Sequence, residues 1–323
     1  CDGTNATSQT VNVSGIRAVA GNTSTLLSNY TFATSGLTST GTISPATLTV
    51  GSITAPAKTY GQAASVPVIA YAGILGSDTT AFTTSLSGGA IDSPTLGAGS
   101  YTVSVTGQSN TNYILAANPP TGTLTVNKAI ITVAGIGATT HAYGDAAIST
   151  NTLAAATTIS GLVNGDTFGS LNPVYTIKNG GGTTVTDGTT LNAATYSSNL
   201  TGITSANYQL SGVGAAGVLT VTPKILTLSS LVNAGHSYGS SAATTSYSLS
   251  STVGSDVITP IFTVTNAAGK VVTDGPTLGV ATYTITVSGL SATSPAIASN
   301  YALAANTSSL FTITPATLTL GVY

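Results

Sequence analysis

The sequence predicts an all-β, mostly β-stranded protein, built from tandem β-grasp-like or immunoglobulin-like modules of about 80–95 residues in an extended rod. Three observations predict this fold class. The composition favours strands and turns, short segments alternate between apolar and polar residues, and an ordered set of motifs recurs along the chain.

The composition combines enough apolar residues for a packed core with very few charges. Hydrophobic residues make up 41% of the 323 residues and charged residues only 4%, where an average globular protein has roughly 25%. Thr, Ser, Gly and Asn supply most of the polar remainder, and these residues favour strands or turns. Because Glu and Met are absent and Lys is rare, strong helix formers are scarce.

The low charge also excludes several classes of partner and site. The chain has 6 Lys plus Arg, 8 acidic residues and a net charge of -2, so it lacks the clustered cations that bind nucleic acid. No run of about twenty apolar residues exists, and no membrane insertion is expected. Cys1 is the only cysteine, which excludes an internal disulfide framework and a multi-cysteine metal site.

Alternation places the core within each predicted strand. In residues 46–50, Leu48 and Val50 share the face expected to be buried, and Thr47 and Thr49 share the other. Later segments alternate in the same way and place Val103, Val105, Ile285 and Val287 in the core.

The recurring motifs follow one another in a fixed order. A pair of alternating strands, joined at Pro or Asn, occurs at 41–50, 122–133, 217–228 and 311–320. A Tyr-Gly dipeptide follows it, at Tyr60, Tyr143 and Tyr238. An Asp-containing turn comes next, at Asp78, Asp166 and Asp256, and a second Asp turn at Asp92, Asp187 and Asp274 leads into a strand. An Asn-Tyr dipeptide closes each repeat, at Tyr30, Tyr113, Tyr208 and Tyr301.

The repeat divides the chain into modules the size of a small domain. Three whole modules are predicted, at 46–127, 128–223 and 224–315. Residues 1–45 match the second half of a module, and residues 316–323 match the first strand of a further module or a donor strand. Pro45, Pro223 and Pro315 lie at the joints, and because Pro fixes φ these joints are expected to be short and stiff.

The ordered motifs resemble the MBG and YDG modules of large bacterial surface proteins, notably filamentous-haemagglutinin-like adhesins. The resemblance covers essentially the whole chain and is carried by residues 46–50, Tyr143-Gly144-Asp145, 160–166, 102–107 and 122–126. It implies a β-grasp-like fold and an extracellular, non-catalytic role at the bacterial cell surface. The chain departs from the family pattern where Gln62 and Ser240 follow Tyr-Gly in place of Asp.

The recurring tyrosines are the main candidate structural and interface residues. They are Tyr60, Tyr143, Tyr238, Tyr113, Tyr208 and Tyr301. A Tyr at a fixed repeat position is expected to be a core or corner residue whose hydroxyl bonds backbone. The alternative, a stack of aromatic rings for a sugar, is disfavoured because the chain has no Trp and only 6% aromatic residues.

No catalytic, cofactor or metal site is predicted. The Asp residues are isolated in sequence and are interpreted as Asx turns, so a calcium site with converging oxygens is not expected. His141 and His236 lack the partners of a zinc site and are expected at the surface or as caps. No paired carboxylates, Ser–His–Asp spacing or activated Cys is present, so the chain is not expected to be an enzyme.

The leading functional hypothesis is a non-enzymatic structural region of an extracellular bacterial stalk or fibre supporting adhesion or aggregation. Its partners would be other copies of itself or adjoining modules, because uncharged, Thr-rich strand edges tend to pair with other chains. In the first alternative, residues 316–323 act as a donor strand and join subunits head to tail into a filament, through Ala316, Thr317, Leu318, Thr319 and Leu320. The second alternative is a module that binds host or cell-surface glycans.

Overall fold

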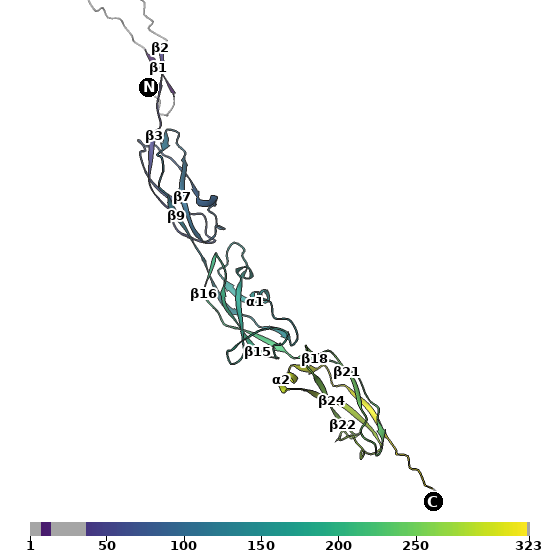
Figure 1. The fold of residues 1–323 in the computed structure, drawn as a ribbon. Coiled ribbons are helices and arrows are strands. Elements are labelled where there is room, and N and C mark those ends of the chain that lie inside the picture. Colours follow the sequence, from purple (N-terminus) through teal and green to yellow (C-terminus); the bar gives the residue numbers. More distant parts are fainter. Residues whose placement is uncertain (1–7, 14–36, 322–323) are drawn as a thin grey trace, which may run out of the picture. The chain divides into compact units, whose positions relative to one another are not determined.

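The computed structural model describes residues 8–13 and 37–321, which divide into two compact units (Figure 1). The first unit lies within Cys1–Ala129 and also takes Val163–Gly165 and Ala206–Gln209. The second contains Ile130–Leu162, Asp166–Ser205 and Leu210–Tyr323. Each unit is described by itself.

The first unit begins with a pair of strands and continues with a two-sheet strand set. Strands β1 (Ser8–Val13) and β2 (Leu37–Thr42) are antiparallel, with Ser8 opposite Thr42. The remainder of the predicted half-module 1–45 lies outside the described residues, apart from Ile43, Ser44 and Pro45.

The strand set that follows is called the first module. Its elements are β3 (Ala46–Thr54), β4 (Lys58–Thr59), β5 (Val68–Ala72), β6 (Phe82–Leu86), the 3-10 helix η2 (Ser87–Gly89), β7 (Gly99–Gln108), β8 (Tyr113–Leu115) and β9 (Gly122–Asn127). One sheet has the order β5-β3-β8 and the other β4-β9-β7-β6. Strand β3 is parallel to β8, and the short β4 is parallel to the last strand, β9.

The second module repeats this arrangement. Its elements are β10 (Ala129–Ile136), β11 (Thr139–Ala142), α1 (Thr150–Ala156), β12 (Thr157–Ser160), η3 (Phe168–Leu171), β13 (Pro173–Lys178), β14 (Thr184–Val185), β15 (Ala194–Ile203), β16 (Tyr208–Gly212) and β17 (Gly217–Thr222). The sheets are β12-β10-β16 and β11-β17-β15-β13-β14, and β11 is parallel to β17.

The third module has the same plan, with its first strand split in two. Its elements are β18 (Lys224–Leu226), β19 (Leu228–Asn233), β20 (His236–Ser237), β21 (Thr245–Leu249), β22 (Ile258–Thr265), β23 (Val271–Val272), β24 (Thr282–Ala292), α2 (Pro295–Ala298), β25 (Tyr301–Leu303) and β26 (Ser308–Thr314). Strand β18 pairs with β25, β19 pairs with β21, and the large sheet has the order β20-β26-β24-β22-β23.

The two sheets of a module pack face to face around an apolar core. In the third module, Leu228 and Leu231 from β19 pack against Ile285 and Val287 from β24 and Ile313 from β26. The residues predicted to alternate do so: Leu48 and Val50 are buried, whereas Thr47 and Thr49 are exposed. Val103, Val105, Ile285 and Val287 are buried as well, so the alternation predicted from the sequence is confirmed.

The all-β fold class is confirmed, and the two-sheet packing favours the immunoglobulin-like alternative over a β-grasp. Two short α-helices, α1 and α2, occur in the described residues. Helix α1 begins where the Ser149 hydroxyl accepts the Thr152 N–H, which caps the helix. No helix among these residues is long and apolar enough to cross a lipid bilayer.

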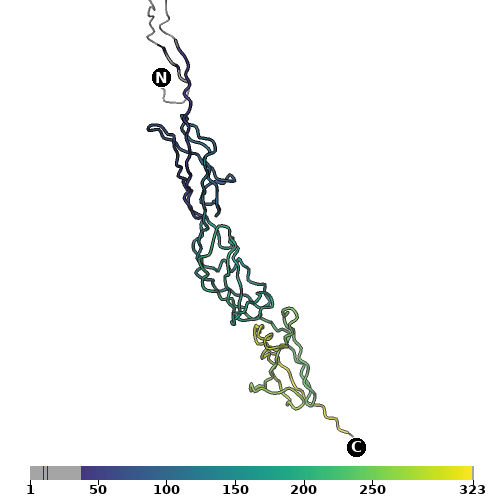
Figure 2. The backbone as a smooth tube through the Cα atoms, turned by 60° about the vertical axis from the view of Figure 1, so that its left-hand side comes forward, coloured from purple at the N-terminus to yellow at the C-terminus, as the bar shows by residue number. Residues whose placement is uncertain are grey.

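Single residues separate successive modules along the chain. Lys128 lies between β9 and β10, and Pro223 lies between β17 and β18. Figure 2 traces the backbone as a tube coloured along the sequence.

Candidate functional site: the tyrosine joints

The recurring tyrosines meet in pairs, and within the second unit one pair joins two modules. Tyr143 directly follows β11, and its N–H donates to the Thr222 carbonyl at the end of β17, at 2.8 Å. This places its ring beyond the last strand of the second module. There it lies edge to face against Tyr301, the first residue of β25, with ring centroids 5.5 Å apart and planes at 79°.

Asp256 binds both hydroxyls of this pair. Its Oδ2 accepts from Tyr143 Oη at 2.9 Å and from Tyr301 Oη at 2.7 Å. Tyr301 Oη in turn accepts the N–H of Val253 at 2.8 Å. Burial, together with the Asp256 carboxylate, raises the pKa of Tyr301 to about 12 and also raises that of Tyr143. One carboxylate of the third module therefore holds tyrosines from two modules.

Asn300 makes a second polar link across the same joint. Its side chain is 1% exposed. Its Oδ1 accepts the Ala193 N–H at 2.7 Å, and its Nδ2 donates to Asn192 Oδ1 at 2.9 Å. Its carbonyl accepts the N–H of Lys224 at 2.8 Å. The buried amide therefore ties the β15 side of the second module to the start of the third.

Close apolar packing completes the joint. Gly144 has a φ of +94°, and a Cβ built on it would lie 2.6 Å from Val253 Cγ2. A residue with a side chain would be strained and would displace the valine. One buried cluster includes Leu219 and Val221 of the second module together with Leu226 and Ile258 of the third. The two modules thus share a core rather than touching only at the surface.

The same arrangement occurs within the first unit. Tyr60 lies edge to face against Tyr208, with ring centroids 5.4 Å apart and planes at 80°. Asn207 Oδ1 accepts the Ala98 N–H at 2.9 Å. The Cβ that Gly61 lacks would lie 2.5 Å from Val163 Cγ2, and the N–H of Val163 donates to Tyr208 Oη at 3.1 Å.

We call the two halves of this joint the presenting face and the receiving face. The presenting face is the Tyr-Gly dipeptide with the backbone N–H of Ala98 or Ala193. The receiving face is the Asn-Tyr dipeptide with the loop of Val163 or Val253. The Tyr-Gly motif therefore belongs to the presenting face of a module and the Asn-Tyr motif to its receiving face.

Four of the six candidate tyrosines belong to these two pairs. Tyr113 is buried as well, and its Oη donates to Asp78 Oδ2 at 2.6 Å, which raises its pKa. Tyr238 differs, because 47% of its surface is exposed. The hydroxyls of Tyr113, Tyr143 and Tyr301 bond carboxylates, where the sequence led us to expect backbone partners and isolated Asx-turn aspartates.

The candidate donor-strand residues form no strand. Strand β26 ends at Thr314, and Ala316, Thr317, Leu318, Thr319 and Leu320 follow it in extended, unpaired chain among the described residues. Leu318 is 90% exposed and Leu320 is 91% exposed.

A buried pair of charged or polar side chains in each module was missed by the sequence analysis. Lys58 Nζ donates to Asp92, His141 Nε2 lies 2.9 Å from Asp187 Oδ1, and His236 Nε2 lies 2.8 Å from Asp274 Oδ1. Both histidines were expected at the surface or as caps, whereas their side chains are only 5% and 6% exposed and each lies against an Asp carboxylate. The recurrence of Lys or His two residues before Tyr-Gly, together with an Asp at the second turn, could have signalled these pairs.

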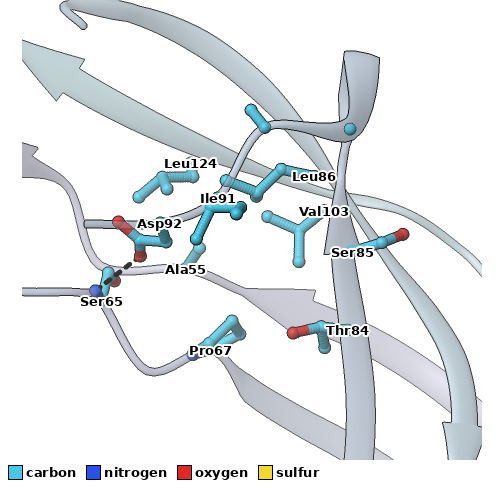
Figure 3. A pocket seen from close by; sticks show the side chains of 12 residues that line it. Ala55, Ser65, Pro67, Thr84, Ser85, Leu86, Ile91, Asp92, Val103 and Leu124 are labelled. Carbon is cyan, nitrogen blue, oxygen red and sulfur yellow. Dashed lines mark hydrogen bonds between the residues drawn. The ribbon is translucent and has the colours of Figure 1, made fainter. Parts of the chain in front are cut away.

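Asp92 of the pair in the first module borders a hollow beside strands β6, β7 and β9 (Figure 3). The hollow has a volume of about 320 Å³, and its walls include Ile91, Leu86, Val103 and Leu124. Its one carboxylate, Asp92, is already engaged, since its Oδ2 accepts the Ser65 N–H at 2.7 Å. The described residues contain no group of three or more His, Cys, Asp or Glu that could hold a metal ion.

Comparisons with known proteins find only distant likenesses. No protein-family model matches the sequence, and the search of curated proteins finds no match. The crystal structure of Drosophila N-cadherin EC1-4 is 9% identical, covers 84% of this chain and 76% of that chain, and has a TM-score of 0.23. Sidekick-1 immunoglobulin domains 1-5 are 11% identical, cover 86% of this chain and 63% of that chain, and have a TM-score of 0.23.

Proposed function

We propose that the chain is a non-enzymatic structural region of an extracellular bacterial stalk or fibre that supports adhesion or aggregation. Its modules would be of the MBG and YDG type, as their motifs suggest. The partners would be adjoining modules of the same kind. The observation that carries this proposal is the joint of Tyr143, Tyr301 and Asp256, which fixes one module on the next through a shared core.

A stalk must transmit force from module to module without a slack linker. Only Pro223 separates β17 from β18, so the chain passes from one module to the next in a single residue. The joint adds side-chain bonds at two separate places, Asp256 on the tyrosines and Asn300 on the β15 side. Bending the joint would break bonds to buried polar groups, each costing about 1–3 kcal/mol.

The same design explains how a chain with 4% charged residues avoids non-specific pairing at its module ends. The joint covers the apolar ring of Tyr143 and the buried side chain of Leu226. Few free charges are then needed to protect these ends from other chains.

Single-molecule stretching of the chain between terminal tags tests the mechanical role. We expect a series of discrete unfolding events, because each module has its own set of packed sheets. A variant that combines Asp256→Ala with Asn300→Ala should yield at lower force in the second unit only. Smooth extension without discrete events would contradict the proposal.

The extracellular location is tested on the source cells themselves. Antibodies raised against the purified chain should label intact cells, and treatment of those cells with a protease should remove the label. A signal that appears only after the cells are permeabilised would contradict a surface stalk.

The head-to-tail filament remains the second candidate, and the exposure of Leu318 and Leu320 favours it. Two apolar side chains on an unpaired segment suit addition to a sheet edge elsewhere. Negative-stain electron microscopy of the purified chain, with and without residues 316–323, distinguishes the two. Filaments that disappear on deletion would favour the subunit, and unchanged isolated particles would favour the stalk.

A further inference from the structure

We propose that the end of the third module at Tyr238 is a binding face for one further module of the same kind, recognised by an Asn-Tyr dipeptide and a Val or Leu loop. This inference rests on the proposed function and names the partner that the joints require. It is carried by the equivalence of Tyr238 with Tyr143 and Tyr60, whose partners are present in this chain.

The backbone presents the three tyrosines in the same way. The N–H of Tyr238 donates to the carbonyl of Thr314 at 2.8 Å, at the end of the last strand of its module. Tyr143 makes the same bond to Thr222 at 2.8 Å and Tyr60 to Asn127 at 2.9 Å. The presenting face is therefore fully built in the third module.

The following glycine shows the same conformation and a different environment. Gly239 has a φ of +89°, close to the +94° of Gly144 and the +92° of Gly61. Its N–H donates to the carbonyl of Pro276 at 3.1 Å, as Gly144 donates to Thr189 at 3.1 Å. A Cβ on Gly239 would meet nothing within 4 Å, whereas one on Gly144 would meet Val253. The space that a valine fills in the other joint is open here.

The exposed fractions of the three tyrosines differ in the same way. Tyr238 is 47% exposed, whereas Tyr143 is 5% and Tyr60 is 7% exposed. An aromatic ring of this size contributes a large share of the burial energy of an interface. The covered tyrosines therefore indicate what covers the exposed one.

The place for the asparagine is also present. Ala193 and Ala98, which donate their N–H groups to the asparagine, each lie three residues before a tyrosine. The hydroxyl of that tyrosine donates to the carbonyl four residues before it, as Tyr196 donates to Asn192 at 2.8 Å. Tyr283 makes the same bond to Gly279 at 2.9 Å, which puts Val280 in the position of Ala193. Val280 is exposed.

The segment after β26 carries the pattern of a first strand. Ala316, Leu318 and Leu320 occupy the positions of Ala46, Leu48 and Val50, counted from the preceding proline. Leu48 and Val50 are buried in β3, which pairs with β5 and β8. In an occupied joint, residues 316–318 would pair in parallel with the Asn-Tyr strand of the added module, as residues 46–48 pair with Tyr113–Leu115 of β8.

The first module has, at its start, a receiving face of the kind that would bind at Tyr238. Tyr113 Oη donates to Asp78 and accepts the N–H of Leu75 at 3.0 Å, the same bonds that Tyr301 makes with Asp256 and Val253. A hollow of about 340 Å³ adjoins Leu75, Asp78 and Tyr113. Such a face supplies the aromatic edge, the carboxylate and the apolar side chain that Tyr238 and Gly239 lack.

The test extends the full chain by one module and follows Tyr238. Residues 134–222 are fused directly after Leu320, so that residues 316–320 take the place of the first strand of the added module. Nitration of each tyrosine by tetranitromethane is then measured by peptide mass spectrometry. We expect the rate at Tyr238 to fall at least about fivefold on extension, since the reagent reaches only exposed rings. Tyr247, which is also exposed and does not belong to the presenting face, is the internal control.

A second extension guards against failure of the added module to fold. Residues 229–314 are fused after Leu320, so that a receiving face with Val253 is offered in place of one with Val163. In either extended chain, Tyr238→Ala should lower the urea midpoint of the added module, and the same change in the 323-residue chain should leave the midpoints unaltered. Tyr143→Ala should lower the midpoint of the second unit in all chains.

Unchanged nitration of Tyr238 in both extended chains, with each added module folded, would overturn the inference. Failure of the Tyr143→Ala control would instead count against the proposed function, so the two failures are distinguishable.

Discussion

The hydroxyls of Tyr143 and Tyr301 converge on a single oxygen of Asp256, at 2.9 Å and 2.7 Å, while their rings lie edge to face with centroids 5.5 Å apart. Tyr143 lies in space beside the end of the last strand of the second module, and Tyr301 is the first residue of β25 in the third. The pair therefore couples the stability of the two modules, because the Tyr143 hydroxyl loses its acceptor if they separate.

Asp256→Ala should destabilise the second unit by about 2–4 kcal/mol, since two nearly buried hydroxyls lose a charged acceptor. Asp256→Asn keeps one acceptor oxygen and should cost less. Urea unfolding, followed by hydrogen exchange of the β18 and β25 amides, measures the change. Equal stability of the Ala variant and the original chain would show that Asp256 contributes nothing to the joint.

Asn300→Ala should cost about 1–3 kcal/mol, because the Ala193 N–H loses its acceptor inside the joint. Asn306→Ala, at an exposed position in the turn between β25 and β26 of the same module, is the control and should be nearly neutral. Chemical denaturation of the two variants gives the comparison. The expectation fails if both substitutions have the same effect.

Gly144→Ala and Gly239→Ala form a matched pair of substitutions. Both place a Cβ at positive φ and should lose about 1–2 kcal/mol. Gly144→Ala should lose about 1–3 kcal/mol more, because its Cβ would also collide with Val253. Thermal and urea unfolding report the difference, and a Gly239 variant as unstable as the Gly144 variant would contradict the assigned contact.

The joint should loosen at alkaline pH. The pKa of Tyr301 is raised from 10.0 to about 12, so between these values the folded state keeps a proton that the unfolded state releases. Its contribution to stability is therefore complete below pH 10 and is lost as the pH rises towards 12. Ultraviolet titration of the phenolate together with urea unfolding measures this, and Tyr301→Phe should remove this part of the pH dependence.

The third module should also respond to histidine titration. The Ser237 carbonyl and the Asp274 carboxylate raise the pKa of His236 above its usual 6.5. The stabilisation from protonated His236 is then fully present below pH 6.5 and is lost as the pH rises through the raised native pKa. NMR titration of the imidazole gives the pKa directly. A value at or below that of an unfolded histidine would contradict the pairing with Asp274.

Much of the strand pattern could be predicted from sequence because a strand buries every second residue. Leu48 and Val50 illustrate this, as do Ile285 and Val287. The Tyr-Gly and Asn-Tyr motifs could also be recognised, because they recur in order. The recurrence of a motif, however, does not show which residues the motif contacts in the folded protein.

The contacts of the joint could not be predicted because they join residues far apart in the chain. Nothing local to Asp256 indicates that Tyr143 will reach it, and an Asx turn was the simplest local interpretation. The pairing of His141 with Asp187 was missed for the same reason. The exposure of Tyr238 is equally invisible in sequence, since its dipeptide matches that of the buried Tyr143.

The sequence by itself determined that this protein is all-β, modular and poor in charge, because composition and alternation act residue by residue. Only the tertiary structure decided which residues form the joints, since a joint exists where the end of one two-sheet module meets the start of another. The hydrogen bonds and ring contacts that hold it depend on distances in space, and those distances are set by the packing of both modules at once.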